Sequence, residues 1–309
     1  MAQHTITVIG NTNLDIMVSG VADLPAPGTE RIVPGIDIRV GGSAGNLAIR
    51  CAGLGQPTTL ISRVGRDEST VLVRSALEIN HLESILVLDE ELPSAVTVAV
   101  ESPGIDRAFL SSLGAMASAG LDDVPAAALS AEFVVLAGYF LLPGFRGKNL
   151  EALCDRARAA GARTVLDTGW PPQGWTEPVR AELLAALRTV DVFLPNDDEL
   201  LGLTDAGSVR EGALALAAET NTVIAVKLGS RGAALATPEG QWYEESTRPV
   251  RVVDSTGAGD GFNAALLVSV IRGSSWPEAL RIAVAYATTL VSTPAAQRPG
   301  VSLPEVTRA

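Results

Sequence analysis

The sequence predicts an α/β protein in which a mostly parallel sheet is flanked by helices, in three layers, and carries a small β-sheet lid. Short β-branched runs alternate with Ala- and Leu-rich amphipathic stretches, a pattern typical of a parallel sheet with crossover helices. A length of 309 residues and a hydrophobic content of 47% suffice for a large buried core. Two segments of period-two alternation predict the lid.

Six strands and seven helices follow from the alternation. The predicted strands are Thr5–Ile9, Thr58–Ile61, Phe133–Leu136, Thr164–Asp167, Val190–Leu194 and Val223–Lys227. The predicted helices are Ala44–Leu54, Glu68–Ile79, Asn149–Ala160, Glu177–Arg188, Ser208–Glu219, Gly257–Arg272 and Trp276–Val291. Beyond the last helix, Pro294, Pro299 and Pro304 predict a non-helical tail.

The lid is expected where the strand–helix rhythm breaks. Residues 31–40 (RIVPGIDIRV) alternate apolar and polar positions, and residues 95–112 (AVTVAVESPGIDRAFLSS) predict two strands around a Pro-Gly turn. Both segments are typical of antiparallel, half-covered strands. We therefore predict a single α/β domain over residues 1–309, with a lid formed by about 12–45 and 94–115.

Composition argues against several classes of function. A net charge of −12 leaves no basic surface for nucleic acid. The two cysteines, Cys51 and Cys154, form no C-x-x-C pattern and suit a reducing cytosol, and no signal peptide or membrane-spanning apolar run is evident, so we expect a cytoplasmic protein. With only His4 and His81 present, a histidine triad or histidine-rich metal site is not expected.

Residues 252–262 (VVDSTGAGDGF) form a glycine-rich turn between a strand-like stretch and an apolar helix. One interpretation is a tight turn in which Asp260 complements the helix dipole. The other is catalytic: the backbone N–H groups of Gly257, Ala258 and Gly259 surround a migrating phosphoryl group, while Asp260 faces the attacking hydroxyl as a general base. Local evidence alone leaves both open.

Six segments resemble one family, in order along nearly the whole chain. DSTGAGDGF (254–262) is similar to the D-T-x-G-A-G-D-x-F signature of the ribokinase/PfkB family of carbohydrate kinases. The other matching segments are GNTNLDIM (10–17), GGSAGNLAIRCAGLG (41–55), LPNDDE (194–199), VKLGSRGAAL (226–235) and RIAVAYATTLVSTPAAQ (281–297). The resemblance implies a ribokinase-like, Rossmann-type fold and transfer of phosphate from ATP to a primary hydroxyl of a small sugar or sugar derivative. It also implies Mg²⁺ and a homodimer formed through the lid.

The resemblance assigns roles to individual residues. Around the sugar it places Asn13, Asp15, Gly41, Gly42, Asn46 and Tyr139. On the nucleotide side it places Asn196, Lys227, Gly229 and Val284. A carboxylate following a strand, as Asp15 does, lies where open α/β sheets bind ligands and can accept hydrogen bonds from vicinal hydroxyls.

Two cation sites are also implied. Asn196 and Glu199 suit Mg²⁺ held through water, although PNDDE equally describes a helix N-terminus with acidic residues in its first turn. Lys227 could touch a nucleotide phosphate or extend to the surface. Asp254 and Thr256 match positions that hold a monovalent cation, K⁺, in ribokinase-like members.

Several positions depart from the ribokinase pattern. Ser43 stands where ribokinases usually carry Lys, and Tyr139 or Phe140 replaces an acidic sugar-binding residue. Val284 lies where a polar residue often contacts adenine, and Ala295 replaces a glycine of the loop beside the monovalent cation. These departures weaken a strict ribokinase assignment and make the need for K⁺ an open question.

Three alternatives to a sugar kinase follow. A nucleoside kinase of the same family is the nearest, although Phe109 is the one aromatic residue that the predicted lid offers for stacking a base. A nicotinamide-dependent oxidoreductase requires G-x-G-x-x-G after the first strand, which GNTNLD does not supply. A non-catalytic sugar-binding regulator would be expected to lack Asp260 or the glycines of residues 257–259.

Overall fold

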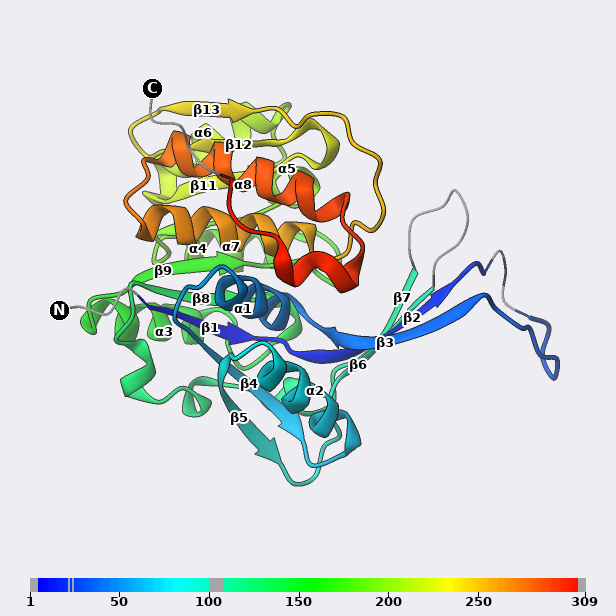
Figure 1. The fold of residues 1–309 in the computed structure, drawn as a ribbon. Helices are drawn as coiled ribbons and strands as arrows, with labels where there is room; N and C mark the ends of the chain where they lie inside the picture. The colour runs from blue at the N-terminus through cyan, green and yellow to red at the C-terminus, as the bar shows by residue number, and fades with distance from the viewer. Residues whose placement is uncertain (1–4, 22, 24, 101–107, 305–309) are drawn as a thin grey trace.

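The computed structural model describes residues 5–21, 23, 25–100 and 108–304. Within these residues the larger sheet has nine strands in the order β13-β12-β11-β10-β9-β8-β1-β4-β5 (Figure 1). Pairing is parallel from β11 to β5, and β12 and β13 add antiparallel at the other edge. The strands are β1 (Ile6–Gly10), β4 (Thr58–Gly65), β5 (Glu83–Asp89), β8 (Phe133–Ala137), β9 (Arg163–Asp167), β10 (Val192–Phe193), β11 (Val223–Lys227), β12 (Ala233–Ala236) and β13 (Trp242–Glu245).

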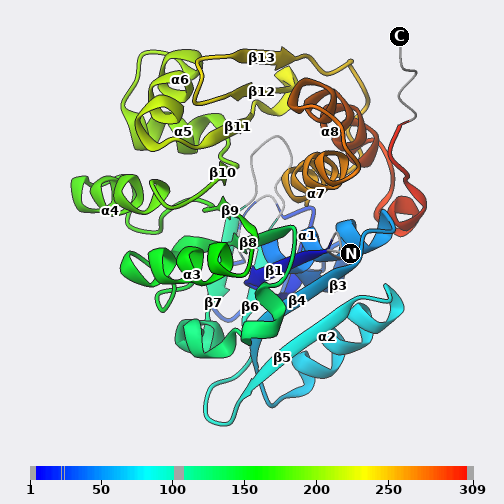
Figure 2. The same cartoon turned by 90° about the vertical axis from the view of Figure 1, so that its left-hand side faces the viewer.

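Helices cover both faces of this sheet. Figure 2 shows α3 to α6 on one side and α1, α2, α7 and α8 on the other. Each side has its own apolar core, one including Leu153, Leu183 and Leu216 and the other Leu47, Leu266 and Leu280. The helices are α1 (Ser43–Gly53), α2 (Glu68–Ile79), α3 (Lys148–Ala159), α4 (Glu177–Leu187), α5 (Asp197–Thr204), α6 (Val209–Thr220), α7 (Ala258–Ile271) and α8 (Trp276–Val291).

This architecture confirms the predicted fold class, and all six predicted strands and seven predicted helices are present with small shifts at their ends. Four elements of the α/β body, β5, β12, β13 and α5, were not predicted. β12 reads AALA, and alanine has low β propensity, whereas α5 is only eight residues long. The prediction of a non-helical tail was wrong at Ala295–Gly300, which form a 3₁₀ helix.

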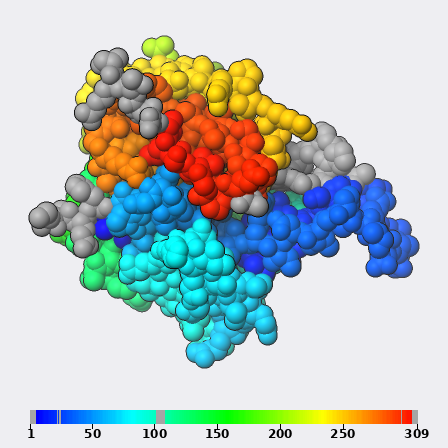
Figure 3. All heavy atoms as spheres, in the orientation of Figure 1, coloured from blue at the N-terminus to red at the C-terminus, as the bar shows by residue number. Residues whose placement is uncertain are grey.

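The lid is a separate four-stranded sheet in the order β3-β2-β6-β7. Its strands are β2 (Asn13–Ser19), β3 (Gly35–Gly41), β6 (Val96–Val100) and β7 (Ala108–Ser112). β2 pairs antiparallel with β3 and parallel with β6, and β6 pairs antiparallel with β7. The expected Pro-Gly turn lies at 103–104, outside the described residues. The space-filling view shows part of the lid, together with residues 25–34, extending beyond the α/β body (Figure 3).

At the level of Asp15 and Ile16 in β2, the two faces of the lid differ in polarity. Residues paired in register share a face of a sheet, and neighbouring positions along a strand point to opposite faces. One row is polar and consists of Arg39, Asp15, Thr97 and Ser111. The next row, on the opposite face, is apolar and consists of Ile38, Ile16, Val98 and Leu110.

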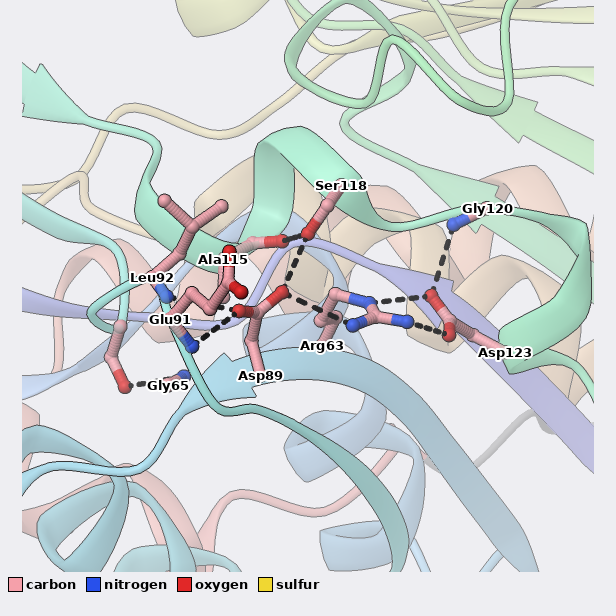
Figure 4. A network of polar contacts seen from close by, with 10 residues as sticks. Arg63, Gly65, Asp89, Glu91, Leu92, Ala115, Ser118, Gly120 and Asp123 are labelled. Carbon is pink, nitrogen blue, oxygen red and sulfur yellow. Dashed lines mark hydrogen bonds and ion pairs between the residues drawn. The ribbon is translucent and has the colours of Figure 1, made fainter.

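A polar network fixes the base of the lid to the body (Figure 4). The Arg63 guanidinium in β4 donates two hydrogen bonds to Asp123, at 2.6 and 3.1 Å, and a third to Asp89 at 3.1 Å. Asp89 also accepts from Ser118 Oγ at 2.8 Å and from the backbone N–H of Leu92 at 2.9 Å. The network thus ties the segments that precede β6 and follow β7 to the end of β4.

We expect Arg63→Met to lower the free energy of unfolding by about 2 kcal/mol, because it leaves the buried Asp123 carboxylate without its bidentate partner. Urea denaturation measures the loss. Arg66→Met is the matched control, since Arg66 and its partner Glu90 are both largely exposed, and it should change stability little. Equal losses in both variants would contradict the structural role of the network.

Candidate active site

The N-terminus of α7 lies between two cavities at the carboxyl edge of the sheet. We call the first the α7–α8 cavity. It has a volume of about 350 Å³, and Lys227, Gly229, Gly259 and Val284 are among its lining residues. The second, the lid cavity, has a volume of about 300 Å³, and its lining residues include Asn13, Asp15, Asn46, Gly257 and Asp260. The turn therefore supplies residues to both cavities.

The turn before α7 leaves only part of the predicted set of three amide groups open to a ligand. Gly257 caps α7 with φ of 71°, a left-handed conformation that favours glycine. The N–H of Ala258 donates to the Ser255 carbonyl oxygen at 3.2 Å, so it is already engaged within the turn. Of the three amide groups predicted to surround a phosphoryl group, those of Gly257 and Gly259 are the better placed to meet a ligand.

Asp260 is held so that its carboxylate faces the lid cavity. Its Oδ2 accepts a hydrogen bond of 3.0 Å from Asn46 Nδ2 in α1. Burial, together with repulsion from Asp167, raises the pKa of Asp260 to about 7, and Lys227, the Asn46 hydrogen bond and Arg50 oppose that rise. A carboxyl group with this pKa can take up a proton near neutral pH, which is what a general base requires.

Lys227 lies beside the turn in a cluster of carboxylates. Its Nζ is 2.8 Å from Asp167 Oδ2, which also accepts from Asn263 Nδ2 at 2.6 Å. Burial would lower the pKa of Lys227, but the neighbouring Asp167 and Glu199 raise it on balance, so the side chain is a fixed positive charge. A Cβ built on Gly259 would lie 3.9 Å from Lys227 Nζ, which places the ammonium close to the turn.

Polar groups of the lid line the other cavity. Asn13 Nδ2 donates to Asp15 Oδ1 at 2.6 Å and to Thr97 Oγ1 at 3.3 Å. Burial raises the pKa of Asp15, while the Asn13 hydrogen bond and Arg39 act against that rise. The missing side chain of Gly41 makes room for Asp15, since a Cβ there would come within 1.9 Å of the Asp15 carboxylate. Gly42, with φ of 84°, lines the same cavity, and a Cβ built on it would come within 2.7 Å of Asn13 Oδ1.

Several site residues escaped the sequence analysis. They are Asn11, Thr97 and Ser111 at the lid cavity and Asp167 and Asn263 beside Lys227. Asp167 could have been found, because it ends a predicted strand at the edge where ligands bind in open α/β sheets. Thr97 and Ser111 became recognisable only once the register of β6 and β7 showed that they share a face with Asp15.

Asn196 and Glu199 form a reciprocal capping box at the start of α5. Asn196 Oδ1 accepts from the Glu199 N–H at 2.7 Å, and Glu199 Oε2 accepts from the Asn196 N–H at 2.9 Å. Burial raises the pKa of Glu199 to about 7 despite the opposing charge of Lys227. Among the described residues no group of three or more His, Cys, Asp or Glu could hold a metal ion. Each of these two side chains thus already has an oxygen engaged in the helix cap.

Tyr139 is not brought to the lid cavity. The side chain is fully buried, and its hydroxyl donates to Glu182 at 2.6 Å and accepts from the Gly147 N–H at 2.9 Å. Burial and the Glu182 hydrogen bond raise the pKa of Tyr139 above its usual range. Both hydrogen-bonding functions of the hydroxyl are thus used within the protein, and no direct contact with a sugar is expected.

Asp254 and Thr256, the residues matched to a monovalent cation, are already paired with protein groups. Asp254 Oδ1 accepts from the Thr256 N–H at 2.9 Å, and Asp254 Oδ2 lies 3.2 Å from Arg39 Nη1. Burial would raise the pKa of Asp254, but the Thr256 hydrogen bonds and the charges of Arg298 and Arg39 hold it below its ordinary value. The carboxylate therefore stays ionised.

Comparison with known proteins identifies the family of this chain. Residues 3–302 match the family described as pfkB family carbohydrate kinase. A ribokinase from Arabidopsis thaliana is 30% identical over 300 residues, covering 93% of this chain and 76% of the relative. An aminoimidazole riboside kinase from Salmonella typhimurium is 27% identical over 249 residues, covering 78% of this chain and 76% of the relative. The chain spans 61% of a further relative, the bifunctional protein HldE of Bradyrhizobium, at 26% identity over 309 residues.

Among solved structures, the Arabidopsis thaliana ribokinase complexed with ribose and ATP superposes with a TM-score of 0.79 at 26% identity, covering 95% of this chain and 94% of that one. No helix among the described residues is long and apolar enough to span a bilayer. The family match covers nearly the whole chain, and the solved ribokinase structure shares its fold. The protein is a member of the PfkB family of carbohydrate kinases.

Proposed function

We propose that this kinase transfers the γ-phosphoryl group of ATP to a primary hydroxyl of a small sugar or sugar derivative. The observation that carries the proposal is the position of Asp260, a half-buried carboxylate with a pKa of about 7. It lines the lid cavity, one residue after Gly259, which lines the α7–α8 cavity. A base is useful only beside the nucleophile, so the lid cavity suits the acceptor and the α7–α8 cavity suits ATP. The ATP-bound ribokinase relative supports this choice of donor.

The acceptor is expected to bind through its hydroxyl groups. Asp15 can accept hydrogen bonds from vicinal hydroxyls, and Asn46 and Thr97 present further polar groups to the same cavity. Asn13 holds the Asp15 carboxylate in place by its 2.6 Å hydrogen bond. This arrangement orients a primary hydroxyl toward Asp260, and orientation of this kind supplies a large share of catalysis in phosphoryl transfer.

Residues on opposite sides of the turn before α7 then carry out proton transfer and charge stabilisation. Asp260 removes the hydroxyl proton as the oxygen attacks, while the N–H groups of Gly257 and Gly259 bind oxygens of the transferring phosphoryl group. Lys227 adds a positive charge beside Gly259. Mg²⁺ that accompanies ATP would neutralise part of the phosphate charge. In our proposal, Asn196 and Glu199 would contact this ion through water molecules.

The proposal is tested by measuring ADP release with ATP over a panel of sugars, sugar acids and nucleosides. We expect turnover with at least one sugar-like acceptor, with a kcat/KM well above that for any nucleoside. Turnover with nucleosides alone would overturn the sugar assignment. ADP release that no acceptor increases would overturn the proposed phosphoryl transfer.

A nucleoside kinase is retained as the second candidate because one relative is an aminoimidazole riboside kinase. The lid cavity also has an apolar part, formed by Phe109, Leu113, Met116 and Leu141, that could receive a base. A single aromatic ring favours a sugar over a stacked purine, since purine-specific sites tend to enclose the base between aromatic side chains.

Asp260→Asn should lower kcat by roughly 10²–10⁴-fold, because the amide keeps the shape and the Asn46 contact but cannot accept the proton. In the wild type, kcat/KM should rise with pH through about 7 and level off above it, as Asp260 becomes ionised. The variant should show no such rise and should bind ATP normally by calorimetry. Asp155→Asn on the exposed surface of α3 is the matched control. If the Asp260→Asn enzyme kept its full kcat, Asp260 could not be the general base.

We also propose that two chains associate through the apolar face of the lid. On that face, the exposed fractions of Ile36, Ile38 and Leu110 are 61%, 55% and 69%, respectively. Together with apolar residues of the neighbouring strands, these side chains form a continuous apolar surface. Contiguous exposed apolar residues of this kind commonly mark an interface between proteins. The resulting dimer would cover the lid of each chain, and we expect it in the cytoplasm.

Ile38→Lys combined with Leu110→Lys should shift the protein from dimer to monomer, since both charges fall on the proposed interface. Size-exclusion chromatography with light scattering measures the change. Ile79→Lys replaces an equally exposed apolar residue on α2 and should leave the assembly unchanged. A wild-type protein that is monomeric at all concentrations would contradict the proposed assembly.

A further inference from the structure

The guanidinium of Arg298 is buried behind the turn that precedes α7, in contact with oxygen atoms from two segments, 254–256 and 290–293. The side chain is 4% exposed. Its Nη1 donates to the Thr256 carbonyl oxygen at 2.9 Å, and its Nη2 donates to the carbonyl oxygen of Asp254. Its Nε is shared between the carbonyl oxygens of Leu290 and Thr293, at 3.2 and 3.1 Å. Nη1 also lies 3.5 Å from the Asp254 carboxylate.

Carbonyl and carboxylate oxygens converging on one positive charge are the surroundings that a hard metal cation would require. Here the positive charge is the guanidinium of Arg298, a side chain of the protein itself. The guanidinium uses the Thr256 carbonyl and the Asp254 carboxylate, which the family resemblance assigned to K⁺. These residues therefore do not fit a bound monovalent cation, because their oxygens already face a group that carries one unit of charge and several N–H donors.

The positive charges around Asp254 also argue against a bound monovalent cation. Its Oδ2 lies 3.2 Å from Arg39 of β3 and 3.5 Å from Arg298. One carboxylate thus already faces two guanidinium groups. A further cation inserted beside it would be repelled by both, and it would have to displace a hydrogen-bonded, buried arginine to reach the carbonyl oxygens.

We infer that Arg298 is a built-in replacement for the monovalent cation and that this chain needs no K⁺ for activity. Arg298 acts as a positioning residue: it fixes Thr256 through the carbonyl oxygen, while Asp254 fixes the same residue through the N–H. Gly257, whose amide begins the proposed phosphoryl site, is the next residue. The activity part of this inference rests on the proposed function, whereas the cation part can be tested separately.

Wild-type kinase activity should be the same in potassium chloride and in choline chloride at equal ionic strength. The midpoint of thermal unfolding should likewise be the same in the two salts. Strong activation by K⁺, or a midpoint that K⁺ raises above the choline value, would overturn the inference. The thermal measurement needs no acceptor, so it stands even if the proposed reaction fails.

Arg298→Ala should lower kcat/KM by about 10²-fold in choline chloride, because small displacements of catalytic groups have effects of this size. Potassium chloride, or guanidinium ion at low concentration, should restore part of the activity and raise the thermal midpoint of this variant. Arg156→Ala is the matched control, since Arg156 also donates to two backbone carbonyl oxygens, those of Leu121 and Val124, away from the site.

The control variant should lose stability without responding to K⁺ or to guanidinium ion. An Arg298→Ala protein that folds but ignores both ions would overturn the inference, as would an equal response in Arg156→Ala. If Arg298→Ala does not fold, the comparison of the wild-type protein in the two salts still tests whether this chain needs K⁺.

Discussion

Parallel strands in one sheet all end at the same edge, and the candidate active site depends on that constraint. β1 leads to Asn13, β9 ends at Asp167 and β11 ends at Lys227, so residues far apart in the chain meet beside one turn. The crossover helices return the chain to the opposite edge each time, which leaves the carboxyl edge open to ligands. α7 then enters this edge with its N-terminus, and the lid covers it from the other side.

Carboxyl groups outnumber positive charges around Lys227 at this edge of the sheet. Asp167, Glu199 and Asp260 surround the single ammonium of Lys227, so negative charge exceeds positive charge when all are ionised. Two of the carboxyl groups respond with pKa values of about 7. An anionic donor would enter such a site only with its own charge offset, by the backbone N–H groups of the turn and by a metal ion that it brings with it.

The fold was predictable because alternating strands and helices follow local patterns in the sequence. The turn before α7 also follows a local pattern, but the role of Asp260 was assigned only by the family resemblance. What could not be predicted depends on contacts between distant segments: Asn46 and Asp260 are 214 positions apart, and Arg298 reaches Thr256 across 42. Tyr139 was placed near the sugar by its match to a family position, but such a match does not reveal that its hydroxyl would bind Glu182 and Gly147 instead.

The buried Arg298 also changes what can control the turn. A dissolved ion fills its site in proportion to its concentration, whereas a tethered group is present at a fixed effective concentration and cannot be diluted away. The site can then be emptied only by moving the chain that carries it, the 3₁₀ helix Ala295–Gly300 that follows α8. Such a kinase would be indifferent to the salt around it and sensitive instead to whatever binds or loosens its own C-terminal segment.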